Sequence, residues 1–148
     1  MLVWPGRVHV LSEHPALIFD GAHNAESARQ LASTIRQAYG DAPIHWVLGM
    51  SRGKDVEGFL DAIGGSASTV VATTASHDRS MPAESLGQLA RERLGASSNV
   101  IQVTAYADPV RALQSALAQA KSTDVVCAAG SFFLLGDLYS EYLHDAKS

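Results

Sequence analysis

The sequence of 148 residues has a single cysteine, no long apolar run and no cluster of positive charge. Cys127 lies inside the apolar stretch 125–129, which favours a small buried side chain over a reactive thiol and leaves no role for disulfide chemistry. No stretch approaches the roughly 18 apolar residues of a membrane-spanning helix, and residues 1–7 lack the charged start and apolar centre of a signal peptide. The sequence therefore predicts a cytoplasmic protein with no membrane partner.

Several chemical motifs are also missing. Neither Gly-x-x-x-x-Gly-Lys-Ser/Thr nor Gly-x-Gly-x-x-Gly occurs, so any nucleotide chemistry must borrow its phosphate-binding loop from elsewhere. With a net charge of -4 and scattered Lys and Arg, the chain offers no surface suited to nucleic acid. The histidines are dispersed, and no metal site is expected. Apart from His23, they are expected at the surface or partly packed: His9, His14, His45, His77 and His144.

What is present is a composition typical of one globular domain, with 47% apolar and 18% charged residues. Apolar runs typical of strands occur at residues 7–11, 16–19, 44–48, 69–73, 100–103 and 124–128. Helical patterns occur at residues 24–39, 54–63, 83–94, 109–120 and 132–144. Alternating strands and helices predict an α/β fold, a Rossmann-like three-layer sandwich with a mainly parallel sheet of about six strands.

Three loops follow apolar strands and carry polar side chains. They are residues 20–24 (Asp-Gly-Ala-His-Asn), 49–55 (Gly-Met-Ser-Arg-Gly-Lys-Asp) and 130–131 (Gly-Ser). The carboxyl ends of parallel strands gather at one edge of a sheet, where ligands usually bind, so these loops are expected to share one edge. The apolar residues 132–135 that follow are expected to pack the last helix against the sheet.

Each loop has a functional and a purely structural interpretation. Asp20, His23 and Asn24 place a carboxylate, an imidazole and an amide at a helix start, which suits polar or anionic ligand groups. Alternatively, Asn24 only caps the helix and Asp20 only accepts hydrogen bonds from loop N–H groups. Lys54 could meet a ligand carboxylate or lie on a solvated helix face, and Ser131 could cap the last helix, contact a ligand, or do both.

Together these elements resemble one family. The similar segments, which agree in order and spacing, are residues 4–7 (Trp-Pro-Gly-Arg), 19–24 (Phe-Asp-Gly-Ala-His-Asn), 48–50 (Leu-Gly-Met) with 54–55 (Lys-Asp), and 130–132 (Gly-Ser-Phe). They resemble the folylpolyglutamate synthase and dihydrofolate synthase branch of the Mur ligase superfamily. The resemblance runs over nearly the whole chain. It implies that residues 1–148 form a Mur ligase-type C-terminal (glutamate ligase) domain, with the N-terminal ATPase domain absent from this chain.

The reaction implied by the resemblance is ATP-dependent addition of L-glutamate to dihydropteroate or folate through an acyl phosphate. A P-loop N-terminal domain would be the partner and would hold most of the Mg²⁺ site. Arg7 resembles the interdomain arginine that reaches the ATP phosphates and acts in catalysis. Asp20 and His23 resemble the nucleotide-side contacts, and Asn24 would support the same loop.

Two further roles are implied on the amino-acid side. Lys54 resembles the catalytic lysine that meets the carboxylate of the incoming amino acid, and Ser131 resembles the hydroxyl on the glutamate side. The sequence departs from the family pattern at Ala25, where proline is often found, at Phe133, where an aromatic hydroxyl is common, and at residues 51–53, where an acidic residue often precedes the lysine. Neither Ala25 nor Phe133 removes a charged group.

Two other interpretations stay open: a stand-alone amino-acid or nucleotide-binding module without catalysis, and an inert scaffold fragment. A stand-alone module would cover its own interdomain face, whereas a ligase domain would leave the side with Arg7, Asp20 and His23 open and polar. The isolated chain is expected to be inactive and to bind ATP or glutamate weakly, because domain closure would supply the remaining contacts.

Overall fold

The computed structural model describes residues 2–3, 9–95 and 101–147, and the side chains of residues 10–95 and 101–141. Arg7 lies outside the described residues. The described part contains seven strands: β1 (Leu2–Val3), β2 (His9–Glu13), β3 (Ala16–Phe19), β4 (Ile44–Leu48), β5 (Ala67–Thr73), β6 (Gln102–Tyr106) and β7 (Val125–Ala129). It also contains five helices: α1 (Ala25–Tyr39), α2 (Val56–Gly64), α3 (Ala83–Leu94), α4 (Pro109–Gln119) and α5 (Phe132–Lys147).

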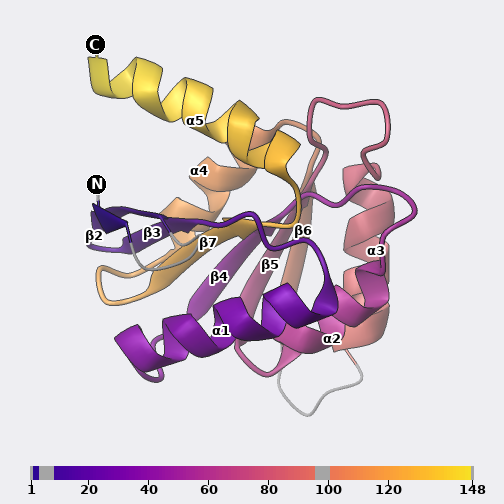
Figure 1. Cartoon of the computed structure of the whole chain (residues 1–148), viewed down its shortest axis with the longest axis horizontal. Coiled ribbons are helices and arrows are strands. Elements are labelled where there is room, and N and C mark those ends of the chain that lie inside the picture. The colour runs from indigo at the N-terminus through magenta and orange to yellow at the C-terminus, as the bar shows by residue number, and fades with distance from the viewer. Residues whose placement is uncertain (1, 4–8, 96–100, 148) are drawn as a thin grey trace.

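The strands form one sheet in the order β1-β2-β3-β7-β4-β5-β6 (Figure 1). β3, β7, β4, β5 and β6 run parallel, and β1 and β2 pair antiparallel at one edge. The predicted Rossmann-like α/β sandwich is confirmed. Its last strand in sequence, β7, lies between two early strands, so its carboxyl end meets the carboxyl ends of β3 and β4.

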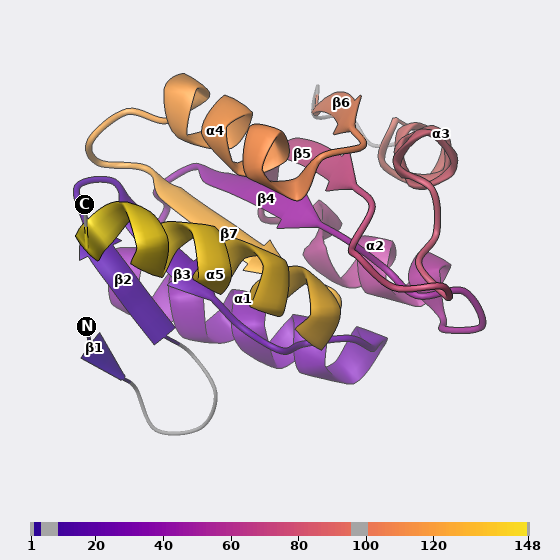
Figure 2. The ribbon, with the colours of Figure 1, turned by 90° about the horizontal axis from the view of Figure 1, so that it is seen from above.

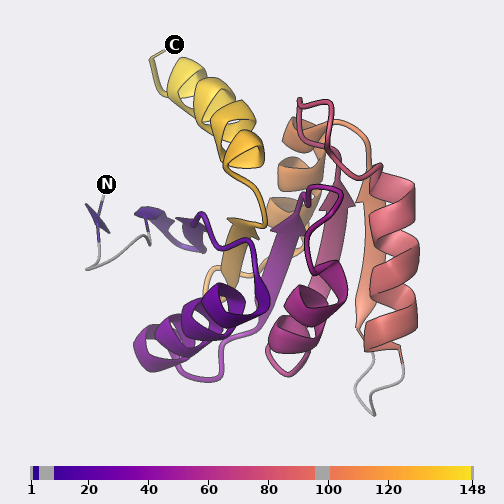
Figure 3. The same ribbon diagram turned by 45° about the vertical axis from the view of Figure 1, so that its right-hand side comes forward.

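Helices cover both faces of the sheet (Figures 2 and 3). On one face, α1, α2 and α3 pack on Trp46 and Val70, among others. On the other face, α4 and α5 pack on Val47 and Val126, among others. Every residue of β4 and β7 is buried, as expected for central parallel strands with both faces covered. Within the described ranges, no helix has the length and apolar character needed to span a bilayer.

The predicted and observed elements differ mainly at their ends. β1 was not predicted, since two residues give no periodicity. β6 runs to Tyr106 rather than stopping at residue 103, because its polar edge-strand residues Thr104 and Tyr106 interrupt the apolar run. α2 begins at Val56 rather than residue 54, because the Asp55 carboxylate accepts a hydrogen bond from the Gly58 N–H (3.0 Å) and caps the helix. Lys54 therefore lies in the loop, just before the cap.

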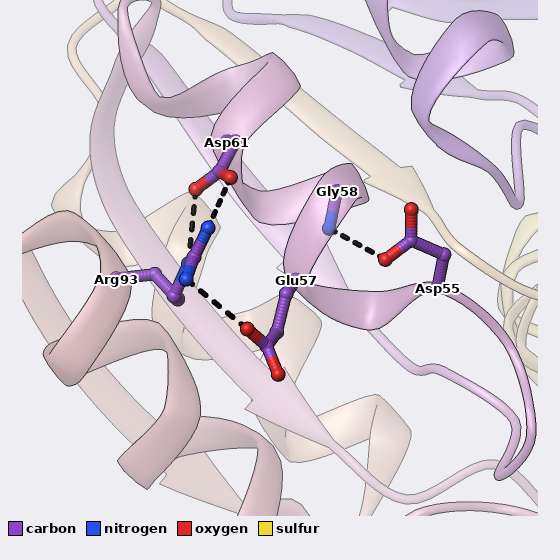
Figure 4. Close-up of polar contacts among 5 residues, drawn as sticks. All are labelled: Asp55, Glu57, Gly58, Asp61 and Arg93. Atoms are coloured by element: carbon purple, nitrogen blue, oxygen red, sulfur yellow. Dashed lines mark hydrogen bonds and ion pairs between the residues drawn. The ribbon is translucent and has the colours of Figure 1, made fainter.

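A surface ion network ties α2 to α3 (Figure 4). The guanidinium of Arg93 donates to both carboxylate oxygens of Asp61 and to Glu57, the last over 3.1 Å. The hydrogen bond from Arg93 lowers the pKa of Asp61, although partial desolvation opposes the shift. The network links α3 to α2, the helix that starts next to Lys54. Because it is solvent-exposed, it adds little to stability.

A buried polar network lies at the opposite edge of the sheet, where the central strands begin. Nε2 of His45 donates to Asp124 (2.9 Å), and in the neutral ring Nδ1 accepts from the Thr69 hydroxyl (2.8 Å). The expectation that His45 lies at the surface or is only partly packed is wrong, since the residue is 5% exposed. A partner 79 residues away in the sequence makes this burial possible. Burial alone would raise the pKa of Asp124, but the N–H of Lys121 and the His45 ring outweigh it and hold the pKa below its usual value.

Asp124→Asn is expected to lower the free energy of unfolding at pH 7 by about 1–3 kcal/mol, because a buried charge-assisted hydrogen bond is lost. The folded-state pKa of Asp124 lies below the unfolded one. Its carboxylate therefore stabilises the fold above about pH 3.9, and this contribution is lost as the pH falls through the folded-state pKa. Urea denaturation of the wild type and Asp124→Asn, from pH 7 to acid pH, should show the difference in their free energies of unfolding becoming smaller. A difference that stays constant would contradict the lowered pKa of Asp124.

Candidate functional site

The turns after β3, β4 and β7 meet around one pocket. Its volume is about 300 Å³, and it is lined by the side chains of His23, Ser51, Lys54, Ser131, Phe132 and Phe133 together with Gly130. Because β7 lies between β3 and β4, the Ser131 turn lies between the turns that carry His23 and Lys54. The prediction that the three polar loops share one edge of the sheet is confirmed.

Backbone contacts form the base of this edge. The Gly130 N–H donates to the Ala22 carbonyl (2.7 Å), and the Gly49 N–H donates to the Ala129 carbonyl (3.3 Å). Gly130 has φ +110°, and a Cβ atom there would lie 2.6 Å from the Gly49 carbonyl oxygen. Only glycine at position 130 allows the second and third turns to approach this closely.

Asp20 and Asn24 both organise the first turn. The Asp20 carboxylate is 5% exposed and accepts a hydrogen bond from the Ala22 N–H (2.8 Å). Asn24 accepts from the Ser27 N–H (2.8 Å) at the start of α1 and forms a capping box with Ser27. Neither side chain lines the pocket. Asp20 is therefore buried and serves as an acceptor within the turn after β3, and its expected nucleotide-side contact stays a prediction.

His23 is the member of this loop that lines the pocket. Its Nδ1 lies 3.1 Å from the Gly21 carbonyl, which can only accept, so Nδ1 carries a hydrogen and Nε2 is the remaining polar atom. The ring is half-buried, and its centroid lies 6.2 Å from that of Phe132. Its position suits contact with a polar ligand group.

Lys54 is exposed on the second turn and has no ion pair with any described residue. Gly53, with φ +82°, reverses the chain just before it. The neighbouring Asp55 carboxylate is engaged in capping α2. The ammonium group is therefore available to an anion, and its role in binding or catalysis stays a prediction.

Ser131 occupies the third turn and is 5% exposed. Its Oγ accepts a hydrogen bond from the Phe133 N–H (3.1 Å), and its carbonyl accepts one from the Leu135 N–H (3.3 Å). The residue thus caps α5 and also lines the pocket. Capping leaves the hydroxyl hydrogen free to be donated to a ligand.

Two aromatic residues at the start of α5 were assigned wrongly from the sequence. Phe132 and Phe133 are 62% and 47% exposed and line the pocket, whereas Leu134 and Leu135 pack against the sheet. Four consecutive residues of a helix cannot all face the same side. This helical periodicity is the signal that could have separated Phe132 and Phe133 from Leu134 and Leu135.

Cys127 lies beneath this edge and is fully buried. Burial, and then the nearby charge of Asp20, raise the pKa of its thiol well above the usual value. The residue is an inert part of the core, as its apolar neighbours predicted. The described residues contain no group of three or more His, Cys, Asp or Glu side chains that could hold a metal ion.

Gly130→Ala is expected to destabilise the protein by about 1–3 kcal/mol, because alanine at φ +110° is strained and its Cβ would collide with the Gly49 carbonyl. Gly136→Ala is the matched control. That residue lies in α5 with nothing within 4 Å of an added Cβ, so the variant should gain about 0.5–1 kcal/mol of helix stability. Thermal unfolding of both variants tests the pair, and equal effects would contradict the close approach.

Comparison with known proteins identifies the family. Residues 6–132 match the family described as Mur ligase, glutamate ligase domain. The chain is 32% identical over 143 residues to a probable dihydrofolate synthetase of Schizosaccharomyces pombe, covering 92% of this chain and 34% of that protein. It is 30% identical over 130 residues to the dihydrofolate synthase/folylpolyglutamate synthase of Escherichia coli, covering 88% and 28%.

Solved structures agree. Escherichia coli FolC in complex with DHPP and ADP superposes with a TM-score of 0.81 at 27% identity, covering 99% of this chain and 33% of that one. The bifunctional synthase of Yersinia pestis with Mn, AMPPNP and L-glutamate bound gives a TM-score of 0.77 at 29% identity, covering 96% and 32%. The chain thus spans about a third of the length of these relatives and corresponds to their C-terminal part. It belongs to the Mur ligase glutamate ligase domain family.

Proposed function

We propose that this chain is the glutamate-binding domain of an ATP-dependent ligase that joins L-glutamate to dihydropteroate or folate. The observation that carries the proposal is one pocket at the carboxyl edge, where His23, Lys54 and Ser131 come together from three separate turns. The family match supports the class of reaction. A related synthase from Yersinia pestis has been solved with L-glutamate and AMPPNP bound, which supports the choice of ligands.

The size and chemistry of the pocket suit an amino acid. Its volume of about 300 Å³ is at the lower end of the range of about 300–1,000 Å³ typical of small-molecule sites, so it is small for a whole nucleotide. Lys54 offers a positive charge to a carboxylate, and the Ser131 hydroxyl offers a directional hydrogen bond. The phenyl rings of Phe132 and Phe133 form an apolar wall against the methylene groups of glutamate.

In the proposed reaction the substrate carboxyl group is activated as an acyl phosphate, and the glutamate amine attacks its carbonyl carbon with release of phosphate. This domain would hold glutamate so that its amine is oriented toward the activated carboxyl. Lys54 would bind the glutamate carboxylate, leaving the amine free to react. The nucleophile is thus positioned by contacts remote from the reacting nitrogen.

The nucleotide would lie beside this pocket, between the two domains. His23 is the candidate contact that the described residues offer at this position, with Asp20 and Asn24 shaping its turn from within. Arg7 is proposed to reach the phosphates. A P-loop N-terminal domain would supply the phosphate cradle and the Mg²⁺ ligands, and a cytoplasmic location is part of the same proposal.

The proposal is tested by ATP- and L-glutamate-dependent phosphate release with dihydropteroate or a reduced folate, comparing the chain alone with the chain joined to a P-loop N-terminal domain of the same family. Activity is expected only in the joined form. Lys54→Ala should raise the KM for glutamate by about tenfold or more, because a charge-assisted hydrogen bond is lost.

Lys121→Ala is the matched control, since this exposed lysine precedes β7 at the opposite edge of the sheet and should leave the KM unchanged. A well-folded joined protein without activity would favour a non-catalytic binding module. An unchanged KM in Lys54→Ala would remove Lys54 from the site while leaving the ligase assignment in place.

The two roles of Ser131 can be separated by substitution. Ser131→Ala should lower stability by about 0.5–2 kcal/mol through the lost cap, and it should also raise the KM for glutamate. Ser131→Asn keeps a cap acceptor, so it should be as stable as the wild type but should keep the raised KM of Ser131→Ala. Ser131→Thr should match the wild type in both stability and KM. Recovery of the KM together with stability in Ser131→Asn would show that the residue only caps the helix.

A further inference from the structure

The loop between β5 and α3, residues 74–82, contacts both walls of the pocket without lining it. One wall is the start of α5, with Ser131 and Phe133. The other is the turn with Ser51 and Lys54. These walls come from segments about eighty residues apart in sequence. A loop that holds both can fix the distance between them.

The loop is attached to α5 by two contacts. The N–H of Ser76 donates to the Asp137 carboxylate over 2.8 Å. The imidazole of His77 stacks on the Phe133 ring, with 3.8 Å between ring centroids and 18° between planes. Phe133 in turn donates its N–H to Ser131 Oγ. His77 therefore braces the aromatic wall from outside the pocket.

The same loop is attached to the other wall by its backbone. The N–H of Arg52 donates to the Arg79 carbonyl (2.7 Å), and the N–H of Met81 donates to the Met50 carbonyl (2.8 Å). Between these two bonds, Ser51 and Ser80 form an antiparallel bridge. The Lys54 turn is thus paired with residues 79–81 through one antiparallel bridge and two flanking backbone hydrogen bonds.

His77 joins the two attachments. Its Nδ1 accepts a hydrogen bond from the Arg79 N–H (3.1 Å), and its carbonyl accepts one from the Ser80 N–H (3.0 Å). One imidazole therefore contacts Phe133 through its face and shapes the turn that pairs with Ser51 through its edge. Any displacement of this ring changes both walls together.

We propose that residues 74–82 act as a strap that sets the spacing of the amino-acid pocket, and that His77 is a positioning residue of this site. The inference rests on the proposed function for the choice of ligand, but the strap itself is a property of the free chain. His77 is exposed and lies outside both hydrophobic cores, so its removal should leave the fold intact.

Three variants separate the contacts of His77. His77→Phe keeps an aromatic ring for stacking but has no acceptor. His77→Asn keeps an acceptor for the Arg79 N–H but no ring. His77→Ala keeps neither. Backbone amide NMR spectra of the full 148-residue chain, without ligand, should show shifted Ser51 and Lys54 signals in His77→Ala, although His77 forms no hydrogen bond with either residue. The shifts should be smaller in the other two variants, and the melting temperature should be close to that of the wild type.

L-glutamate titrated into the same samples gives the functional readout. The dissociation constant should rise by about threefold to thirtyfold in His77→Ala, the range expected for coupling through packed contacts, with intermediate values for the two partial variants. Unchanged Ser51 and Lys54 signals in His77→Ala would overturn the strap, whatever glutamate does. If the Ser51 and Lys54 signals shift in His77→Ala but the wild-type chain does not respond to saturating glutamate, the strap is supported and the proposed ligand is contradicted. Shifted signals with unchanged glutamate affinity would overturn His77 as a positioning residue.

Discussion

The insertion of β7 between β3 and β4 is the constraint on which the site depends. β7 is buried along its whole length, so its sequence must be apolar and its register is fixed by neighbours on both sides. That register brings Gly130 against the Gly49 carbonyl and the Ala22 carbonyl. A one-residue slip would turn the apolar side chains of β7 to the opposite faces and separate the three turns.

The site divides into a rigid base and a variable rim. The base consists of backbone hydrogen bonds between turns, a buried carboxylate at Asp20 and a glycine in a conformation that other residues avoid. The rim consists of His23, Lys54 and the two phenylalanines, whose side chains are partly or fully exposed. Chemistry can therefore be changed at the rim without altering the hydrogen bonds of the base, which explains how one domain fold can present different ligand groups at the same place.

Much of this arrangement could be predicted from the sequence, and the misses share a physical cause. Apolar runs predicted the central strands, and the turn residues predicted which loops gather at the carboxyl edge. The pairing of His45 with Asp124 could not be predicted, because its partners are distant in sequence and no local pattern marks them. The start of α5 was misassigned because residues 132–135 were assigned to one face as a single apolar run. The i, i+3, i+4, i+7 spacing that faces the sheet is that of Ser131, Leu134, Leu135 and Leu138, which leaves Phe132 and Phe133 outside. The strap could not be predicted because its contacts to Phe133 and Ser51 join residues that are far apart in the sequence.

The late position of β7 in the chain has a consequence for synthesis. β3 and β4 leave the ribosome long before β7, so their facing edges have unpaired N–H and C=O groups until residues 125–129 are made. A chain that stops before this point would have two apolar edges and no pocket, and it would be prone to aggregate or be degraded. The pocket therefore forms only after residues 125–131 have been made, because the turn with Ser131 lies between the turns with His23 and Lys54.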